Sequence, residues 1–372
     1  MKFIIAKKDI FNALSVASKG ISNYSPLPSL SGIKIDVNQN NIYFTGSDSN
    51  ISIQTVICAS QDNKLEIEST GSIVIGCTYL LEIVRKIDDE TITFDSYDGT
   101  LINISSNNSS FTLNGIKSIE YPPIDFTQPS MNFKVSSEQL KEVINQTIFA
   151  TSTQETRPVL TGVNFYAIHN ELNCVATDSY RLAKKVIEID NECEFNITIP
   201  NKSLSEVIKI IDNEETIDIA LDEKKAQFII GDTIIQTRLI DGVYPDTNRL
   251  IPESFDYELI IDKHDILSAI DRASLIKNDG VSVIKLELNE AQCIISSKSM
   301  EVGSSTEILN GANFKGKDLH LSFNGKYVFE AVKTLKGSLV RFSFCGEMKA
   351  FIIESIDDSS VLQLVLPVRT YS

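Results

Sequence analysis

Three adjacent residues, Tyr180, Arg181 and Leu182, place an aromatic ring, a guanidinium and an aliphatic chain in succession. Tyr and Arg dominate the energetics of protein interfaces, so this trio is typical of a surface that binds another protein. A plain core hairpin explains the same three residues. The two interpretations are separated by asking whether the surrounding segment recurs elsewhere in the chain without the trio.

The segment that must position the trio is predicted to be a β-hairpin followed by an ordered turn. An apolar, β-prone run over residues 159–165 leads to a polar tip at 169–171. Asp178 and Ser179 follow the return strand and can turn the chain through side-chain to backbone hydrogen bonds. The return strand alternates as a strand buried on one face would, with Leu172, Cys174 and Ala176 against Asn173, Val175 and Thr177.

Enzyme motifs are absent from the sequence. It contains no GxxxxGK[ST], no GxGxxG after a strand, no GxSxG and no HExxH. We expect His169, His264 and His320 to be solvated or satisfied, because none has a neighbouring Ser, Cys or carboxylate at a telling distance. The six cysteines form no CxxC pair, so neither a metal site nor a cofactor is predicted. The chain is predicted to be non-catalytic.

Length and composition indicate an ordinary globular protein. The 372 residues suffice for two or three domains, with 42% hydrophobic and 23% charged residues. No run of 18 apolar residues is present and the N-terminal apolar run is too short for a signal peptide, so a cytoplasmic protein without membrane attachment is predicted. The net charge of −16 argues against a nucleic-acid partner but does not exclude one, since a basic face within an acidic exterior gives the same total.

A strand followed by an amphipathic helix recurs three times. Strands at residues 3–5, 133–135 and 259–261 each precede a helix, for which Asp9 is the predicted N-cap in the first copy. The anchors Ile10, Leu140 and Ile266 lie 130 and 126 residues apart. The predicted buried faces are Ile10, Ala13, Leu14 and Ala17; Leu140, Val143, Ile144 and Thr147; and Ile266, Ala269, Ile270 and Ala273.

A second strand and helix also recur three times. Strands at 72–75, 196–199 and 320–323 precede these helices, and each helix carries a Glu at the same place. Glu82, Glu206 and Glu330 are 124 residues apart, which is one third of 372, so the chain is predicted to be three domains of one kind. The predicted faces are Leu80, Ile83, Val84 and Ile87; Leu204, Val207, Ile208 and Ile211; and Val328, Ala331, Val332 and Leu335.

The hairpin that carries the trio has a counterpart 130 residues earlier. Residues 30–33 and 45–49 match 160–163 and 175–179, but Asn50, Ile51 and Ser52 stand where the trio would be. The third copy keeps strand character at 283–288 and 293–296 but loses the Asp-Ser turn. The recurrence without the trio favours the protein-binding interpretation.

Short alternating strands, such as residues 91–94, 101–104, 217–220 and 227–230, indicate antiparallel sheets within each domain. Tyr121-Pro122-Pro123 and Tyr244-Pro245-Asp246 read as linkers near the ends of the first two copies. The predicted domains are residues 1–126, 127–252 and 253–372, and the predicted fold class is α+β.

These repeats and a set of specific motifs resemble the bacterial DNA polymerase III beta subunit family, the DNA sliding clamps, over the whole chain. The pattern is most similar to clamps of Gram-positive type. The motifs are MKF at 1–3, TGSD at 45–48, ETRPVLTGV at 155–163, ATDSYRLA at 176–183, RLIDGVYPD at 238–246 and LPVR at 366–369.

The resemblance implies a head-to-tail homodimeric ring of six domains, with helices lining a central hole and antiparallel sheets outside. Such a ring closes through a heterologous interface and holds double-stranded DNA by topology, without base contacts. The implied partners are DNA polymerase III alpha subunit, the clamp loader and other proteins that carry a clamp-binding motif. The implied function is that of a processivity factor.

The resemblance also implies roles for individual residues. DNA contacts carry over to Lys202, Arg272 and Tyr24, and dimer contacts to Phe111 and Leu113 of domain one against Leu275 and Ile276 of domain three. Leu275 and Ile276 are expected to extend the helix that carries Ile266 beyond its core face. The family often has His at position 180 and Met at positions 366 and 368, so partner preference is expected to differ here. The peptide groove carries over to Leu160, Thr177, Tyr180, Arg181, Leu182, Pro245, Arg249, Leu250, Leu364, Leu366, Pro367, Val368 and Arg369, with Asn324 and Tyr327 at its edge.

Two alternatives to the clamp follow from the residues themselves. One is a three-repeat scaffold that binds peptides without encircling DNA, and the other is an enzyme with a site assembled across domains. The lack of any motif argues against the enzyme. Basic residues on or beside the six helices favour DNA over the scaffold, namely Lys7, Lys8, Lys19, Arg85, Lys86, Lys141, Lys202, Lys209, Arg272, Lys277, Lys326 and Lys333.

Overall fold

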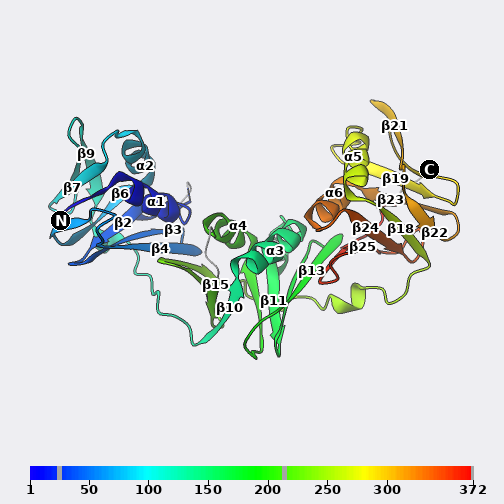
Figure 1. The fold of residues 1–372 in the computed structure, drawn as a ribbon, viewed down its shortest axis with the longest axis horizontal. Coiled ribbons are helices and arrows are strands. Elements are labelled where there is room, and N and C mark those ends of the chain that lie inside the picture. The colour runs from blue at the N-terminus through cyan, green and yellow to red at the C-terminus, as the bar shows by residue number, and fades with distance from the viewer. Residues whose placement is uncertain (23–26, 212–215, 370–372) are drawn as a thin grey trace. The chain divides into compact units, whose positions relative to one another are not determined.

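The computed structural model describes residues 1–22, 27–211 and 216–369 (Figure 1). Each of the six predicted helical segments is a helix. None of the described helices is long and apolar enough to cross a membrane. The helices are α1 (Lys7–Ser18), α2 (Cys77–Lys86), α3 (Ser137–Thr147), α4 (Asn201–Ile210), α5 (Lys263–Ala273) and α6 (Gly325–Thr334).

The helical faces predicted from periodicity are the faces that face the core. In α1 the buried residues are Ile10, Ala13, Leu14 and Ala17, as predicted. Asp9 is not the N-cap of α1, because the helix begins one turn earlier and Ala6 is the capping position without a side-chain hydrogen bond. The apolar stripe predicted the position of each helix. It did not predict the first helical residue, which depends on where the preceding strand ends.

The strands lie where alternation predicted them, and every pairing between the described strands is antiparallel. Strands β1 to β13 lie in the N-terminal half of the chain, and strands β14 to β26 follow. They are β1 (Lys2–Ala6), β2 (Gly32–Val37), β3 (Asn41–Ser47), β4 (Ile51–Cys58), β5 (Glu66–Ser69), β6 (Gly71–Gly76), β7 (Thr91–Tyr97), β8 (Leu101–Ser105), β9 (Ser110–Ile116), β10 (Met131–Ser136), β11 (Gly162–Ile168), β12 (Glu171–Thr177), β13 (Arg181–Glu188), β14 (Phe195–Pro200), β15 (Thr216–Leu221), β16 (Lys225–Ile230), β17 (Thr233–Arg238), β18 (Tyr257–Asp262), β19 (Val283–Leu288), β20 (Cys293–Ser299), β21 (Gly303–Ile308), β22 (Asn313–Lys315), β23 (Leu319–Asn324), β24 (Leu339–Phe344), β25 (Phe351–Ser355) and β26 (Val361–Val365).

The chain forms two compact units. One contains Met1–Ser137 and Lys202–Leu239, and the other contains Glu138–Asn201 and Ile240–Ser372. The predicted central domain therefore contributes to both units, with α4 in the first and α3 almost wholly in the second. The three spans predicted from the repeat, 1–126, 127–252 and 253–372, stay a prediction.

Each unit is built on a sheet that runs across a junction between repeats. In the first unit the strand order is β10-β15-β16-β17-β4-β3-β2-β6-β9-β8-β7-β1-β5. In the second it is β14-β11-β12-β13-β26-β25-β24-β18-β22, with a separate sheet β21-β20-β19-β23. The junction is the β17–β4 pair in the first unit and the β13–β26 pair in the second. These two pairs are called the first and second seam below.

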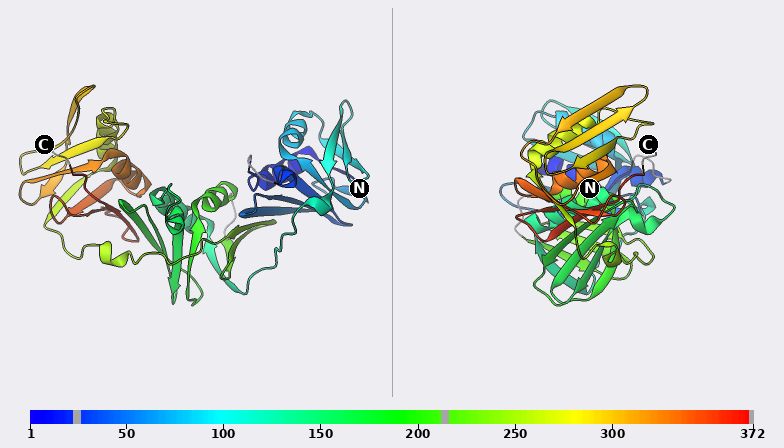
Figure 2. Two further views of the ribbon diagram at one scale, coloured as in Figure 1. Left: turned by 180° about the vertical axis from the view of Figure 1, so that it is seen from behind. Right: turned by 90° about the vertical axis from the view of Figure 1, so that its right-hand side faces the viewer.

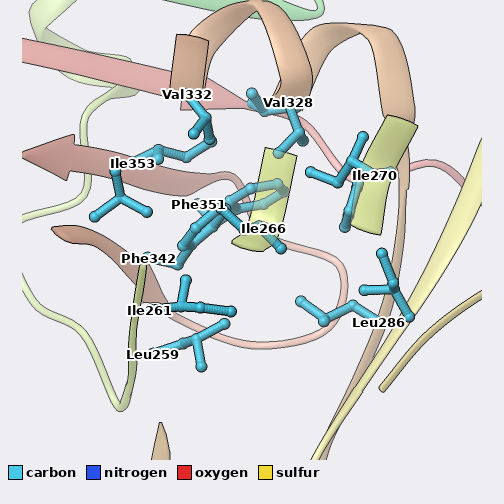
Figure 3. Packing of buried hydrophobic residues seen from close by; sticks show 14 of the residues in the cluster. Leu259, Ile261, Ile266, Ile270, Leu286, Val328, Val332, Phe342, Phe351 and Ile353 are labelled. Atoms are coloured by element: carbon cyan, nitrogen blue, oxygen red, sulfur yellow. The ribbon is translucent and has the colours of Figure 1, made fainter. Parts of the chain in front are cut away.

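The core of the C-terminal repeat lies between its helices and its strands. Figures 1 and 2 show α5 beside α6, and Figure 3 shows Ile266, Ile270 and Val328 of these helices facing Phe342 and Phe351 from the strands. The Phe351 ring lies 5.3 Å from the Phe344 ring and 6.5 Å from the Phe342 ring, measured between centroids. The Phe323 ring lies 6.1 Å from the Phe351 ring, so three other aromatic rings surround Phe351.

Replacing Phe351 with Ala should destabilise the protein by about 3–5 kcal/mol, because it removes a buried ring and leaves a cavity among three other aromatic rings. The measurement is the free energy of unfolding in urea. The matched control is Met348→Ala, an exposed residue in the turn before β25, which should change the stability by less than about 0.5 kcal/mol. Equal effects of the two substitutions would contradict this account of the core.

Candidate partner-binding site

The turn that presents Tyr180 is held by its own polar side chains. The Asp178 carboxylate accepts hydrogen bonds from the backbone N–H groups of Tyr180 and Arg181, at 2.9 and 3.0 Å. The Thr177 hydroxyl donates to the Arg181 carbonyl at 2.6 Å and accepts from the Ser179 N–H at 3.2 Å. Ser179 adopts a φ of +78°, in the left-handed region, which these bonds stabilise. The turn predicted at Asp178-Ser179 is confirmed.

The first repeat contains the same turn without the trio. Asp48 accepts from the N–H groups of Asn50 and Ile51 at 2.9 Å each, and Ser47 takes the place of Thr177. Ser49 also has a φ of +78°. Because the two turns agree in detail, the difference at residues 180–182 is a difference in side chains on an unchanged backbone.

The floor of the site is an apolar cluster on both sides of the second seam. Leu160, Val175, Leu182, Tyr244 and Leu364 are buried together, and Ile251 packs against them. Leu182 is 2% exposed, so it belongs to the buried floor. Predicted groove residues from three distant parts of the sequence, Leu160, Leu182 and Leu364, therefore meet in one place.

Strand β12 differs from its prediction, because it is buried on both faces. Val175 and Thr177, expected on an exposed face, are as inaccessible as Cys174 and Ala176 on the other. The linker residue Tyr244 covers Val175, and its hydroxyl accepts a hydrogen bond from the Thr177 N–H at 3.0 Å. Our sequence interpretation did not include Tyr244 in the site; its aromatic ring beside Pro245 in the linker was the available signal.

Arg181 is buried, and its guanidinium is paired with other groups of the protein. Its Nε donates to the Asp178 carboxylate at 3.0 Å, and its guanidinium makes a short ion pair with Glu330 of α6. The guanidinium carbon lies 4.4 Å from the centroid of the Tyr327 ring and 5.3 Å from that of Phe149. The side chain is 9% exposed.

The second seam contains another buried cation, Lys185. Its ammonium group lies 2.6 Å from the Ser360 hydroxyl, 3.1 Å from the Asp358 carboxylate and 3.6 Å from that of Glu142. At the corresponding place in the first seam, Thr55 and Thr233 share a hydrogen bond of 3.0 Å. The second seam is thus held by ionic contacts where the first is neutral.

The C-terminal segment is fixed beside the turn by its backbone. The Leu366 N–H donates to the Tyr180 carbonyl at 2.9 Å, and the Val368 N–H donates to the Ser322 carbonyl at 2.7 Å. Tyr180, Leu366 and Arg369 are exposed, while Pro367 and Val368 are half-buried. The tail and the turn therefore border the apolar floor, as the sequence indicated.

The remaining predicted groove residues lie around this floor. Pro245, Arg249 and Leu250 are exposed on the linker, where Arg249 pairs with Asp246 at 3.0 Å. Asn324 caps α6 by accepting from the Lys326 N–H at 3.0 Å. Tyr327 lines a cavity of about 620 Å³ with Asn324 and Leu275, and burial raises its pKa.

The predicted DNA and dimer residues lie outside this site. Lys202 is exposed in the first turn of α4, whereas Arg272 is paired with Glu307 of β21 at 2.8 Å. Tyr24 lies outside the described residues. Phe111 is exposed and Leu113 is half-buried on β9. Leu275 and Ile276 do not extend α5, which ends at Ala273; they form the turn after it, and Leu275 is 77% exposed.

Two of the histidines do have carboxylate neighbours, contrary to our expectation. His264 lies 3.8 Å from Asp265 and His320 lies 3.5 Å from Glu287. Asp262, His264 and Asp265 form an acidic cluster at the start of α5. The Asp262 carboxylate already caps that helix by accepting from the His264 and Asp265 N–H groups.

Comparison with known proteins identifies the class of protein to which this arrangement belongs. Models of the DNA polymerase III beta subunit match the N-terminal domain at residues 1–125, the central domain at 134–246 and the C-terminal domain at 248–369. The fold is three tandem clamp domains of the α+β class, as predicted. The chain belongs to the DNA polymerase III beta subunit family.

Individual relatives agree with this assignment over their full length. The beta sliding clamp of Bacillus subtilis (strain 168) is 40% identical over 378 residues, covering 100% of both chains. A crystal structure of the DNA polymerase sliding clamp from Bacillus subtilis superimposes with a TM-score of 0.96, at 38% identity and 100% coverage of both chains. The sliding clamp of Bartonella birtlesii, solved bound to griselimycin, gives a TM-score of 0.93 at 27% identity, again with 100% of each chain covered.

Replacing Tyr244 with Phe should lower the free energy of unfolding by about 1–3 kcal/mol near neutral pH, because the buried Thr177 N–H loses its acceptor. Burial raises the pKa of Tyr244 far above its ordinary value of 10.0. Above that value the unfolded wild-type chain releases the phenol proton while the folded chain keeps it, so wild-type stability falls as pH rises. The Phe variant has no phenol at this position to titrate. The difference in the free energy of unfolding between wild type and variant should therefore become smaller as pH rises.

The measurement is the urea midpoint of both proteins between about pH 8 and about pH 11. The matched control is Tyr121→Phe, the counterpart in the first repeat, whose pKa burial also raises. Its hydroxyl donates a longer bond of 3.4 Å to the Thr45 carbonyl, so the same pH trend should appear with a smaller loss near neutral pH. A gap for Tyr244→Phe that stays constant with pH would contradict the prediction.

Proposed function

We propose that this chain is a DNA sliding clamp, a non-catalytic, ring-shaped processivity factor that acts in the cytoplasm. Two copies close head to tail around duplex DNA, and the ring tethers the replicative polymerase to its template. The observation that carries this proposal is the match to sliding clamps over the whole chain, through all three domains. The strand edges of β9 and β21, the exposed basic residues and the apolar floor each support one part of it.

One partly paired and one open strand edge support closure of a ring. Within the described residues, β9 pairs along its length with β8, but with β6 only through Gly115 and Ile116. Strand β21 pairs with β20 alone among the described strands. Exposed edges invite pairing with another chain, and both strands carry an exposed apolar side chain, Phe111 on β9 and Ile308 on β21. A contact between β9 of one copy and β21 of the next is heterologous and suits a closed ring.

Exposed basic residues on the helices support contact with DNA. Lys8, Lys202, Lys277 and Lys333 are exposed on or just after four different helices of a chain whose net charge is −16. Of the residues implied by the resemblance, Lys202 is the stronger candidate, because Arg272 is already neutralised by Glu307. Weak, sequence-independent phosphate contacts of this kind let a ring slide.

The apolar floor beside the tail supports binding of partner peptides. A floor of Leu160, Leu182 and Leu364 suits an extended segment that buries aliphatic or aromatic side chains. We assign to this groove the DNA polymerase III alpha subunit, the clamp loader and other proteins with a clamp-binding motif. The griselimycin complex of a related clamp supports ligand binding by this class of protein.

Topological retention on DNA tests the proposal. After loading by the cognate clamp loader with ATP, the protein should stay on closed circular DNA in moderate salt and should leave linear DNA by sliding from its ends. Salt screens phosphate contacts but does not open a ring. Cutting the circle with a restriction enzyme after loading is the matched control and should release the protein. Equal retention on both forms, or none on either, would favour the scaffold that binds peptides without encircling DNA.

The proposed dimer contact predicts the effect of a double substitution. Leu275→Ala with Ile276→Ala should give a folded monomer, because Leu275 is exposed in the single chain and its loss removes apolar area from the contact alone. Light scattering measures the mass, and circular dichroism checks the fold. Ile168→Ala, an exposed residue at a hairpin end, should leave the dimer intact. A folded double variant that remains dimeric at low concentration would place the interface elsewhere.

A further inference from the structure

Arg181 was expected to meet the partner peptide, but its contacts leave little for a ligand. Two of its donors are taken by Asp178 and Glu330, and its guanidinium carbon lies over the rings of Phe149 and Tyr327. The side chain is almost fully removed from solvent. A guanidinium with these partners joins the segments that carry them. These segments are the turn at Asp178, the short 3-10 helix Ile148–Ala150 after α3, and the first turns of α6.

The first seam shows what the second would be without this arrangement. Ile51, on the same turn, stands at the place of Arg181 and pairs with Thr237 as Arg181 pairs with Val365. Glu206 of α4 stands at the place of Glu330, and pairs with Lys209 of its own helix at 2.7 Å. The strands of the first seam therefore pair without a buried cation. The Arg181–Glu330 ion pair is therefore not needed to pair the strands, and it has a different role.

Glu330 and Tyr327 connect this ion pair to the groove. They lie three residues apart on α6 and so share one face of the helix. Arg181 pairs with the first and stacks on the second, so both are held relative to the turn that carries Tyr180. The charges of Asp178, Arg181, Glu330 and Lys326, which lies 3.9 Å from Glu330, balance one another.

We propose that Arg181 is a positioning residue: through Glu330 it fixes α6 and Tyr327 against β13, and it sets the edge of the groove without binding the partner peptide itself. Asp178 orients the guanidinium and Glu330 receives it. This inference rests on the proposed peptide groove. It assigns to Glu330, which was not among the predicted groove residues, an effect on partner affinity.

A double-mutant cycle tests the inference on the full-length protein. The probe is a fluorescein-labelled peptide from the C-terminus of the organism's own DNA polymerase III alpha subunit, and the readout is its Kd by fluorescence anisotropy. The variants are Arg181→Met, Glu330→Gln and both together. Each single variant should weaken peptide binding by about tenfold. The double variant should bind no more weakly than the single variant with the lower affinity, because both substitutions break the same Arg181–Glu330 ion pair.

Hydrogen exchange adds a readout that does not depend on the peptide. The amides of the first two turns of α6 should lose protection in both single variants, while α4 should not change. Glu206→Gln is the matched control, since it breaks an ion pair at the same helical position in the central repeat, and it should leave peptide affinity unchanged. Arg181→Lys keeps the positive charge but lacks the forked donors of the guanidinium. Its peptide affinity should therefore lie between those of Arg181→Met and the wild type.

The outcomes separate this inference from its alternatives. Weak binding by Arg181→Met with full binding by Glu330→Gln would mean that Arg181 touches the peptide, and additive losses would mean the same. Lower unfolding midpoints with unchanged affinity would mean that the ion pair is structural only. Each of these results overturns the proposal. If the wild-type chain does not bind the peptide, the groove assignment fails, and protection of α6 still decides whether Arg181 positions that helix.

Discussion

Main-chain hydrogen bonding across the two seams is the constraint on which the rest of the structure depends. A strand at the end of a sheet exposes a row of N–H and C=O groups that must find partners. Here β17 pairs with β4, and β26 pairs with β13, so each repeat completes a sheet begun by the one before it. The second pairing brings the turn at Asp178, the linker at Tyr244 and the chain's tail together around one apolar floor.

Features that depend on neighbours in sequence were predictable, because their signal is local. The buried faces of all six helices follow from apolar residues recurring every three or four positions, and the turn at Asp178 follows from an Asp that bonds to the next backbone groups. The tandem repeat was visible as Glu82, Glu206 and Glu330 at equal spacing. The resemblance to sliding clamps added residue roles that no local pattern carries; those roles remain proposals.

Features that depend on distant residues were not predictable from pattern. Strand β12 alternates like a half-exposed strand, but Tyr244, 67 residues beyond Thr177, covers its second face. Arg181 looked like a ligand contact because its partner Glu330 lies 149 residues away. The helix end at Ala273 likewise left Leu275 and Ile276 in a turn, where periodicity alone extended the helix. Of these, the Arg181–Glu330 contact crosses the second seam, whereas Tyr244 and Thr177 belong to the same repeat.

The turn at Asp178 has a consequence for how such a protein can change over generations. Its shape is maintained by the Asp178 carboxylate, the Thr177 hydroxyl and the Tyr180 backbone, and the Tyr180 side chain, 62% exposed, adds nothing to those bonds. The first repeat folds the same turn with Asn50 at that position. Substitution at 180 is therefore nearly free of folding cost, so the proposed partner surface can vary at this position while the scaffold is inherited intact.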